Sequence, residues 1–279
     1  MIEVGKYNKL VVSKERDFGF FLKDERGEEV LLPKSLLDGN TINLDDEIEV
    51  FVYLDSSDRR VATMKKPIIT VGEVGYLEVV SQSSFGAFCN NGLEKDLFVP
   101  IREQRFKLLD GKKYLIHAYI DKTGRIAGTT EVDGYLDVAE EGSFKVDDVV
   151  SCITYARSGG ETLKVAIDGK YRGIILGNEH DEVIYPGDTV EARVKRIYED
   201  GVIGLSTRKK RLDAREEIKE KILSYLKRNN GFMEFNDKSN PEDIKREFKT
   251  SKNYFKMALG GLMKEGRIEQ GPEGTKLIK

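Results

Sequence analysis

The sequence predicts a multi-domain protein of three consecutive small all-β barrels followed by a C-terminal winged helix-turn-helix domain. Residues 1–210 consist of short segments rich in β-branched and aromatic residues, separated by turns that contain glycine. One three-part pattern recurs within them at a constant spacing, and from residue 211 onward the apolar residues follow a helical period. The expected domains span residues 1–66, 67–139, 140–210 and 211–279.

The first two expected barrels are copies of one repeat. Phe18-Gly19-Phe20-Phe21 is followed 67 residues later by Phe85-Gly86-Ala87-Phe88. Leu31-Leu32-Pro33 and Phe98-Val99-Pro100 are separated by the same spacing. A constant spacing of this size indicates an internal repeat of one domain.

The motif around Gly86 suggests a binding surface. Phe85 and Phe88 would point to opposite faces of a regular strand, but the glycine between them permits a bulge that brings both rings to one side. A turn with Asp121 and Arg125 follows the next long strand, so the rings would lie beside a carboxylate and a guanidinium. Such a surface suits stacked, unpaired bases. The alternative is that both rings fill the barrel core.

These motifs resemble the RNA-binding repeat of ribosomal protein S-one, most clearly over residues 67–137. The resemblance implies a five-stranded Greek-key barrel of the OB type. It also implies that Phe85, Phe88, Asp121 and Arg125 contact RNA, and that Phe18, Phe21, Asp55 and Arg60 do so in the first repeat. Pro100 stands where many such repeats carry a histidine, so a lower affinity per repeat is expected.

The fourth strand of each repeat carries a tyrosine two residues before the aspartate. Strand alternation places Tyr53 and Tyr119 on the outward face with Asp55 and Asp121. We expect each tyrosine to be an accessory stacking surface; the alternative is that it merely covers the barrel. Four other residues are expected on the same outward faces: Glu49, Phe51, Leu115 and a half-exposed, non-catalytic His117.

The third barrel is predicted to be a degenerate copy. Its first two strands surround a turn at residues 158–160, but it lacks the Phe-Gly-x-Phe motif, and Val202 replaces Arg125. We expect it to act as a scaffold, with phosphate contact open to Arg193, Lys195 and Arg196.

The C-terminal segment reads as three helices and a hairpin, which is a winged helix. Residues 212–229 form the first predicted helix, and Asn240 and Ser251 are expected to cap the second and third. Lys252 and Lys256 share a face of the third helix and are candidate nucleic-acid contacts. Three roles remain open: a phosphate-contacting arm, a protein-docking domain and, least supported, sequence-specific DNA recognition.

The charge distribution limits how nucleic acid could be bound. The net charge is −3 overall, and the first three segments are each acidic. Residues 211–279 carry 16 Lys and Arg against 12 Asp and Glu. Binding by the barrels must therefore rely on stacking and local basic clusters, whereas the C-terminal quarter is electrostatically favoured.

Nothing in the sequence predicts an enzyme. It has no phosphate-binding glycine loop, no Cys/His metal set and no nucleophile with a plausible base, so neither catalysis nor a cofactor is expected. No segment is apolar enough to span a bilayer, and no secretion signal is evident. Cys89 and Cys152 are expected as buried free thiols, which is typical of a reducing cytoplasm.

The order and number of domains resemble the conserved virulence factor B family of Gram-positive bacteria. The resemblance implies an RNA-binding regulator that acts after transcription and affects virulence factors in pathogens. The expected partners are single-stranded RNA and, through the winged helix, duplex nucleic acid or a protein, with no membrane. The alternative is a winged-helix DNA-binding transcription regulator.

Overall fold

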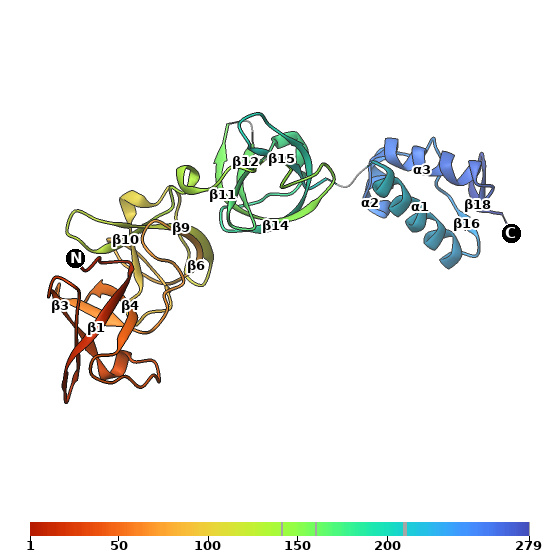
Figure 1. Ribbon diagram of the computed structural model, residues 1–279. Coiled ribbons are helices and arrows are strands. Elements are labelled where there is room, and N and C mark those ends of the chain that lie inside the picture. Colours follow the sequence, from red (N-terminus) through yellow and green to blue (C-terminus); the bar gives the residue numbers. More distant parts are fainter. Residues whose placement is uncertain (141, 160, 209–210, 279) are drawn as a thin grey trace. The chain divides into compact units, whose positions relative to one another are not determined.

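The computed structural model describes residues 1–140, 142–159, 161–208 and 211–278. The chain divides into two compact units, residues 1–207 and 208–279. Figure 1 shows that the first unit is built mainly of small barrels and that the α-helices α1, α2 and α3 lie in the second. The fold predicted from the sequence, three barrels and a winged helix, is confirmed.

The three barrels are closed, five-stranded and identical in strand order. Barrel 1 comprises β1 (Tyr7–Arg16), β2 (Gly19–Lys23), β3 (Glu29–Pro33), β4 (Glu47–Leu54) and β5 (Arg60–Thr63). Barrel 2 comprises β6 (Val74–Gln82), β7 (Gly86–Cys89), β8 (Leu97–Pro100), β9 (Lys113–Ile120) and β10 (Ile126–Thr129). Barrel 3 comprises β11 (Val149–Ser158), β12 (Thr162–Ile167), β13 (Tyr171–Ile175), β14 (Thr189–Ile197) and β15 (Ile203–Ser206). In each barrel the first strand pairs with the second and fourth, and the third and fifth strands run parallel. The described residues also include four short 3-10 helices: η1 (Lys34–Leu36), η2 (Ile101–Glu103), η3 (Asp133–Tyr135) and η4 (Gly177–Glu179).

Each barrel has a bulge in its first strand at the corresponding place. The register shifts between Val79 and Ser81 in β6, and equivalent shifts occur in β1 and β11. The bulge expected at Gly86 therefore lies instead in the strand that pairs with β7. The shift adds local twist to the first strand, as bulges do.

The outward faces of the fourth strands are less exposed than expected. Phe51 and Leu115, both predicted to face outward, are 0% and 2% exposed, and His117 is 3% exposed instead of half-exposed. Phe51 is covered by Tyr7, whose ring lies edge-on to it, and His117 stacks on Tyr135. Strand alternation alone misassigned these residues because other parts of the chain cover the outward faces.

Barrels 2 and 3 share an apolar contact that explains the burial of Leu115. Leu115 belongs to a cluster with Val132 and Leu136 from the connecting segment and with Tyr155 and Ala166 from barrel 3. The Tyr155 hydroxyl donates a 2.6 Å hydrogen bond to the Asp133 carboxylate, and the Tyr76 hydroxyl donates one of 2.6 Å to the Gly187 carbonyl.

The second unit is a winged helix with the predicted caps and core. It contains α1 (Arg211–Arg228), β16 (Phe232–Met233), α2 (Pro241–Phe248), α3 (Lys252–Lys264), β17 (Ile268–Gly271) and β18 (Gly274–Leu277). The Asn240 side chain accepts from the Glu242 amide and Ser251 from the Tyr254 amide, as expected for N-caps. The helical apolar stripes meet in one core, with Ile222, Phe255 and Leu262 fully buried.

The two adjacent glycines of α3 have different environments, which leads to a stability prediction. A Cβ on Gly260 would meet no atom within 4 Å, whereas one on Gly261 would lie 2.5 Å from Arg215 and 2.6 Å from Lys219 of α1. Gly260→Ala should therefore stabilise the winged-helix unit by about 0.5–1 kcal/mol through helix propensity alone. Thermal unfolding of the full chain, with Gly261→Ala as the matched variant that gains less, checks this. Equal gains by the two variants would contradict the close approach of α1 at Gly261.

Both cysteines are free and buried, as expected. Burial raises the pKa of the Cys89 and Cys152 thiols to about 12 in each case. Among the described helices, none combines the length and apolarity required to cross a membrane.

Candidate nucleic-acid interface

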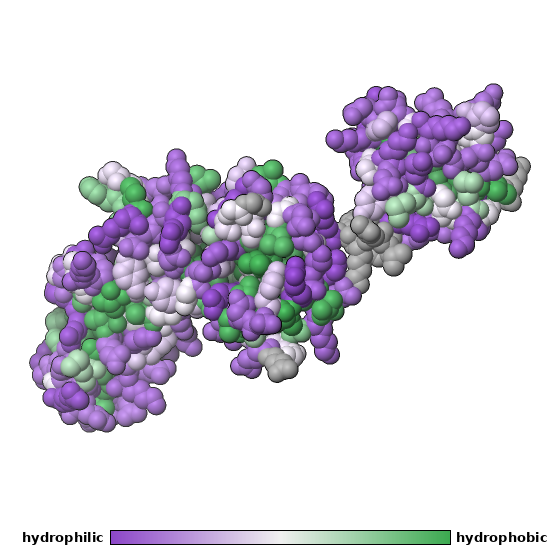
Figure 2. All heavy atoms as spheres, turned by 90° about the horizontal axis from the view of Figure 1, so that it is seen from above, coloured by the Kyte–Doolittle hydropathy of each residue, from purple (hydrophilic) through white to green (hydrophobic). Residues whose placement is uncertain are grey.

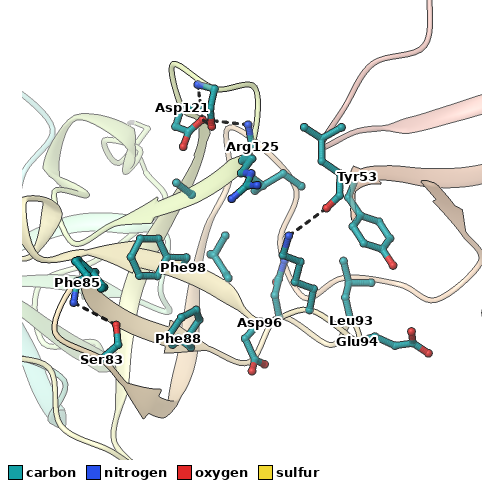
Figure 3. Close-up of a pocket in the computed structure, with 17 residues that line it drawn as sticks. Tyr53, Ser83, Phe85, Phe88, Leu93, Glu94, Asp96, Phe98, Asp121 and Arg125 are labelled. Atoms are coloured by element: carbon teal, nitrogen blue, oxygen red, sulfur yellow. Dashed lines mark hydrogen bonds between the residues drawn. The ribbon is translucent and has the colours of Figure 1, made fainter. Parts of the chain in front are cut away.

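A groove of about 700 Å³ lies where barrel 2 meets barrel 1. Barrel 2 lines most of it, through the β6–β7 hairpin, the segment before β8 and the β9–β10 turn, and barrel 1 contributes Tyr53 and Leu54. Figure 3 shows Phe85, Phe88 and Phe98 together on one side of the groove, with Tyr53 on the side of barrel 1. Two barrels thus form one concave surface.

The aromatic side of the groove is exposed, which excludes the core alternative for Phe85. The Phe85 side chain is 77% exposed. Phe88 and Phe98 are half-buried, and their ring centroids lie 5.1 Å apart at an interplanar angle of 41°. Phe98 was not expected as a site residue, although its position opposite Phe88 in the β7–β8 register would have indicated it.

Gly86 sets this geometry by close approach. A Cβ at this position would lie 2.3 Å from the Val99 carbonyl oxygen and 2.7 Å from the Phe98 ring. The neighbouring strand can therefore pack closely only against glycine. Just before it, the Ser83 hydroxyl accepts a 3.2 Å hydrogen bond from the Phe85 amide. The local backbone thereby places Phe85 at the end of the hairpin, outside the regular strand, so both rings reach the same groove.

Asp121 stabilises the turn that carries Arg125. Its carboxylate accepts hydrogen bonds from the Thr123 amide and hydroxyl and from the Arg125 amide, at 2.7, 2.6 and 3.0 Å. Partial burial alone would raise the pKa of Asp121, but these hydrogen bonds hold it below its ordinary value. Both residues line the groove. The Asp121 carboxylate therefore has a structural role in addition to any contact with a ligand.

The Arg125 guanidinium extends to barrel 1. Its Nε lies 2.6 Å from the Asp58 carboxylate, an ion pair that raises the pKa of Arg125 and lowers that of Asp58. This contact was not expected from the sequence, because the two residues belong to different repeats. Only the pairing of the barrels in space brings them together.

Barrel 1 carries an aromatic pair that resembles the pair in barrel 2 but lies outside the groove. Phe18 is 58% exposed, and its ring lies edge-on to that of Phe21, with centroids 6.2 Å apart. Neither ring lines the groove. The predicted aromatic pair of the first repeat therefore forms its own surface.

The turn of barrel 1 corrects one predicted residue. The Asp55 amide donates to the Arg59 carbonyl as the Asp121 amide donates to the Arg125 carbonyl, so Arg59 is the counterpart of Arg125. Arg60 instead begins β5 and pairs with Glu28. The Asp-x-x-x-Arg spacing shared by both turns could have shown this. Arg59 forms a side-chain ion pair with Asp55 that, with backbone hydrogen bonds, lowers the pKa of Asp55 to about 2.

The two tyrosines proposed as accessory stacking surfaces differ. Tyr53 lines the groove but is only 8% exposed, and it belongs to the barrel 1 core, against which Leu93 from the barrel 2 segment before β8 packs. Tyr119 is half-buried and does not line the groove. Burial is the main cause that raises the pKa of both hydroxyls.

In barrel 3 the residues at the positions of Phe88 and Tyr119 form contacts within the protein. The strand registers align Lys164 with Phe88, and its ammonium pairs with Asp133 at 3.1 Å. A bulge in β14 places Arg196 at the position of Tyr119, with its guanidinium over the Tyr198 ring. Gly160, in the predicted first turn, lies outside the described residues. The scaffold role of this barrel stays a prediction, and these contacts favour it.

On the winged helix, Lys252 and Lys256 lie in the first turns of α3. Lys256 is exposed, while the Lys252 ammonium donates to the Lys238 carbonyl at 3.3 Å. Figure 2 shows hydrophilic residues over most of the visible surface of this unit.

Comparison with known proteins supports both domain types. Residues 4–65 match the S1 domain, and residues 220–277 match the CvfB-like winged helix domain. The S1 match covers barrel 1, and the common strand order extends this architecture to all three barrels. A crystal structure of a multidomain protein with nucleic acid binding domains from Streptococcus pneumoniae is 27% identical, with a TM-score of 0.53 and coverage of 99% of this chain and 98% of that one.

Several relatives match along nearly the whole length. The uncharacterized protein YitL of Bacillus subtilis is 34% identical over 95% of this chain and 91% of its own. Conserved virulence factor B of Staphylococcus epidermidis is 28% identical over 94% of this chain and 90% of its own. With three S1-like barrels and the matching winged helix, the chain belongs to the conserved virulence factor B family.

Proposed function

We propose that this protein is a non-enzymatic regulator that binds single-stranded RNA through the groove of barrel 2 and acts after transcription in the bacterial cytoplasm. The observation that carries the proposal is the aromatic set of exposed Phe85 and half-buried Phe88 and Phe98, which lines the groove together with Arg125. Aromatic rings accept the faces of unpaired bases, and a nearby cation suits the phosphate backbone. The S1 match and the family relationship support RNA as the ligand.

The charge of the barrels favours single strands over duplexes. All three barrel segments are acidic, so they lack the broad positive surface on which non-specific duplex binding depends. Stacking contributes most of its energy when bases are unpaired, because a duplex hides their faces. The recognised feature would therefore be an unpaired stretch of a transcript.

The experiment is a titration of the full chain against labelled single-stranded RNA and duplex DNA of equal length in one buffer. We expect tighter binding of the single-stranded RNA. Preferential binding of the duplex would instead support the second candidate, a winged-helix DNA-binding transcription regulator, and would contradict the proposal.

The winged helix should add electrostatic attraction without setting the preference for single strands. Lys252→Ala with Lys256→Ala removes two cations from the basic C-terminal unit, so the slope of log affinity against log salt should become shallower by up to about 1.4 for single strands. The ratio of RNA to duplex affinity should stay the same. An unchanged salt slope would favour a protein-docking or structural role for α3.

A further inference from the structure

The two cations that line the groove are engaged by one turn of barrel 1. Arg125 Nε lies 2.6 Å from the Asp58 carboxylate. Lys95 Nζ donates to the carbonyl oxygens of Leu54 and Asp55, each at 3.4 Å. The β4–β5 turn, residues 55–59, and the last residue of β4 thus present a carboxylate and two carbonyls to the groove's positive side chains.

Like these carboxylate and carbonyl oxygens, the oxygens of a phosphodiester accept hydrogen bonds from lysine and arginine. We propose that Lys95 and Arg125 form the phosphate-binding part of the groove and that the β4–β5 turn is a built-in competitor for them. The inference rests on the proposed function and adds two elements: Lys95 as a backbone contact, and Asp58 as a residue that limits affinity. A bound strand would place a phosphate where the Asp58 carboxylate now lies.

The contact is suited to being displaced. The Arg125 and Asp58 side chains are 45% and 58% exposed, and exposed ion pairs are weak because water and salt screen them. The Lys95 contacts are long for hydrogen bonds. A fully charged phosphate can therefore replace the turn at small cost.

Other contacts would keep barrels 1 and 2 together when a phosphate displaces the β4–β5 turn. Leu93 packs against the barrel 1 core, and the Val71 amide donates to the Gly5 carbonyl at 3.0 Å. A Cβ on Gly5 would lie 2.2 Å from Val71, so the chain passes closely between the barrels there. Exchange of the turn for a phosphate is thus a local event within a stable pair of barrels.

The test is Asp58→Asn in the full chain, measured by titration of a labelled single-stranded RNA at several salt concentrations. Asparagine tolerates the left-handed backbone of this residue, where φ is +60°, so the turn should be kept. We expect about two- to fivefold tighter binding, which is the scale of one exposed ion pair. The salt slope should change little, because Arg125 contacts a phosphate in the complex of either chain.

Asp168→Asn is the matched control. Asp168 is exposed, lies in a turn of barrel 3 with φ of +51° and does not line the groove. This variant makes the same change of charge in the same backbone conformation. Its affinity should stay within about 1.5-fold of the unaltered chain, since long-range charge effects on exposed sites are largely screened.

Two further variants show whether the effect passes through the proposed cations. Lys95→Ala should weaken RNA binding and make the salt slope shallower by about 0.7. In an Arg125→Ala background, Asp58→Asn should no longer tighten binding, because its effect depends on the pair. Thermal unfolding of each variant verifies that the barrels remain folded.

The outcomes separate the inference from the proposed function. Tighter binding by Asp58→Asn, absent from Asp168→Asn and lost without Arg125, supports the competitor. If the unaltered chain binds RNA but Asp58→Asn has no more effect than Asp168→Asn, the inference is overturned and the proposed function stands. If the unaltered chain binds no single-stranded RNA, both are overturned.

Discussion

Replacing Phe85 with alanine should weaken the binding of single-stranded RNA by about 1–3 kcal/mol, a loss of about five- to 150-fold in affinity, because one stacking surface for a base is removed. The free energy of unfolding should change by less than about 0.5 kcal/mol, since Phe85 is 77% exposed. A filter-binding or anisotropy titration, together with thermal unfolding, measures both quantities. Phe88→Ala should weaken binding similarly but also cost some stability, because its ring packs on Phe98.

Tyr185→Ala is the control for this prediction. Tyr185 is an aromatic residue of barrel 3 that is 58% exposed and lies outside the groove. Its removal should leave RNA affinity unchanged. If both substitutions weaken binding equally, exposed aromatic residues contribute without regard to position, and the groove is not the site.

Gly86→Ala should have the largest effect on stability. The added methyl would meet the Val99 carbonyl oxygen and the Phe98 ring at distances far inside van der Waals contact, and the backbone atom cannot move without opening the β7–β8 pair. Overpacking of this kind costs about 1–3 kcal/mol. Denaturant unfolding of the full chain measures it. RNA affinity should fall as well, because displacement of β8 moves Phe98 away from Phe88.

Gly134→Ala provides the comparison for Gly86. Gly134 lies in η3 of the connecting segment, and a Cβ there would meet no atom within 4 Å. This variant should unfold at nearly the same denaturant concentration as the unaltered chain. Equal stability of the two variants would show that β7 and β8 do not need a glycine at their closest approach.

The architecture could be predicted from the sequence because its signals are local. The repeated Phe-Gly-x-Phe motif, the alternation in the strands and the caps at Asn240 and Ser251 each depend on residues close together in the chain. The exposure of Phe85 also has a local cause, because the residue lies in the turn between β6 and β7.

The contacts between domains could not be predicted, because they depend on how separate barrels meet. Leu115 packs against residues of barrel 3 and of the connecting segment, and His117 stacks on Tyr135 of that segment. The Arg125–Asp58 pair joins residues 67 positions apart. The choice of Arg60 over Arg59 had a different cause: the repeats are offset by 67 residues at the phenylalanines but by 66 at the turns.

The most direct test of RNA binding at the barrel 2 groove is photocrosslinking. Single-stranded RNA that contains 4-thiouridine would be irradiated with the full chain, and the modified residues identified by mass spectrometry. We predict adducts within residues 83–98, which carry Phe85, Phe88 and Phe98, and a strong reduction of these adducts in Phe85→Ala. Adducts confined to the winged-helix residues 208–278, or unaffected by Phe85→Ala, would contradict the assignment of the groove as the RNA-binding site.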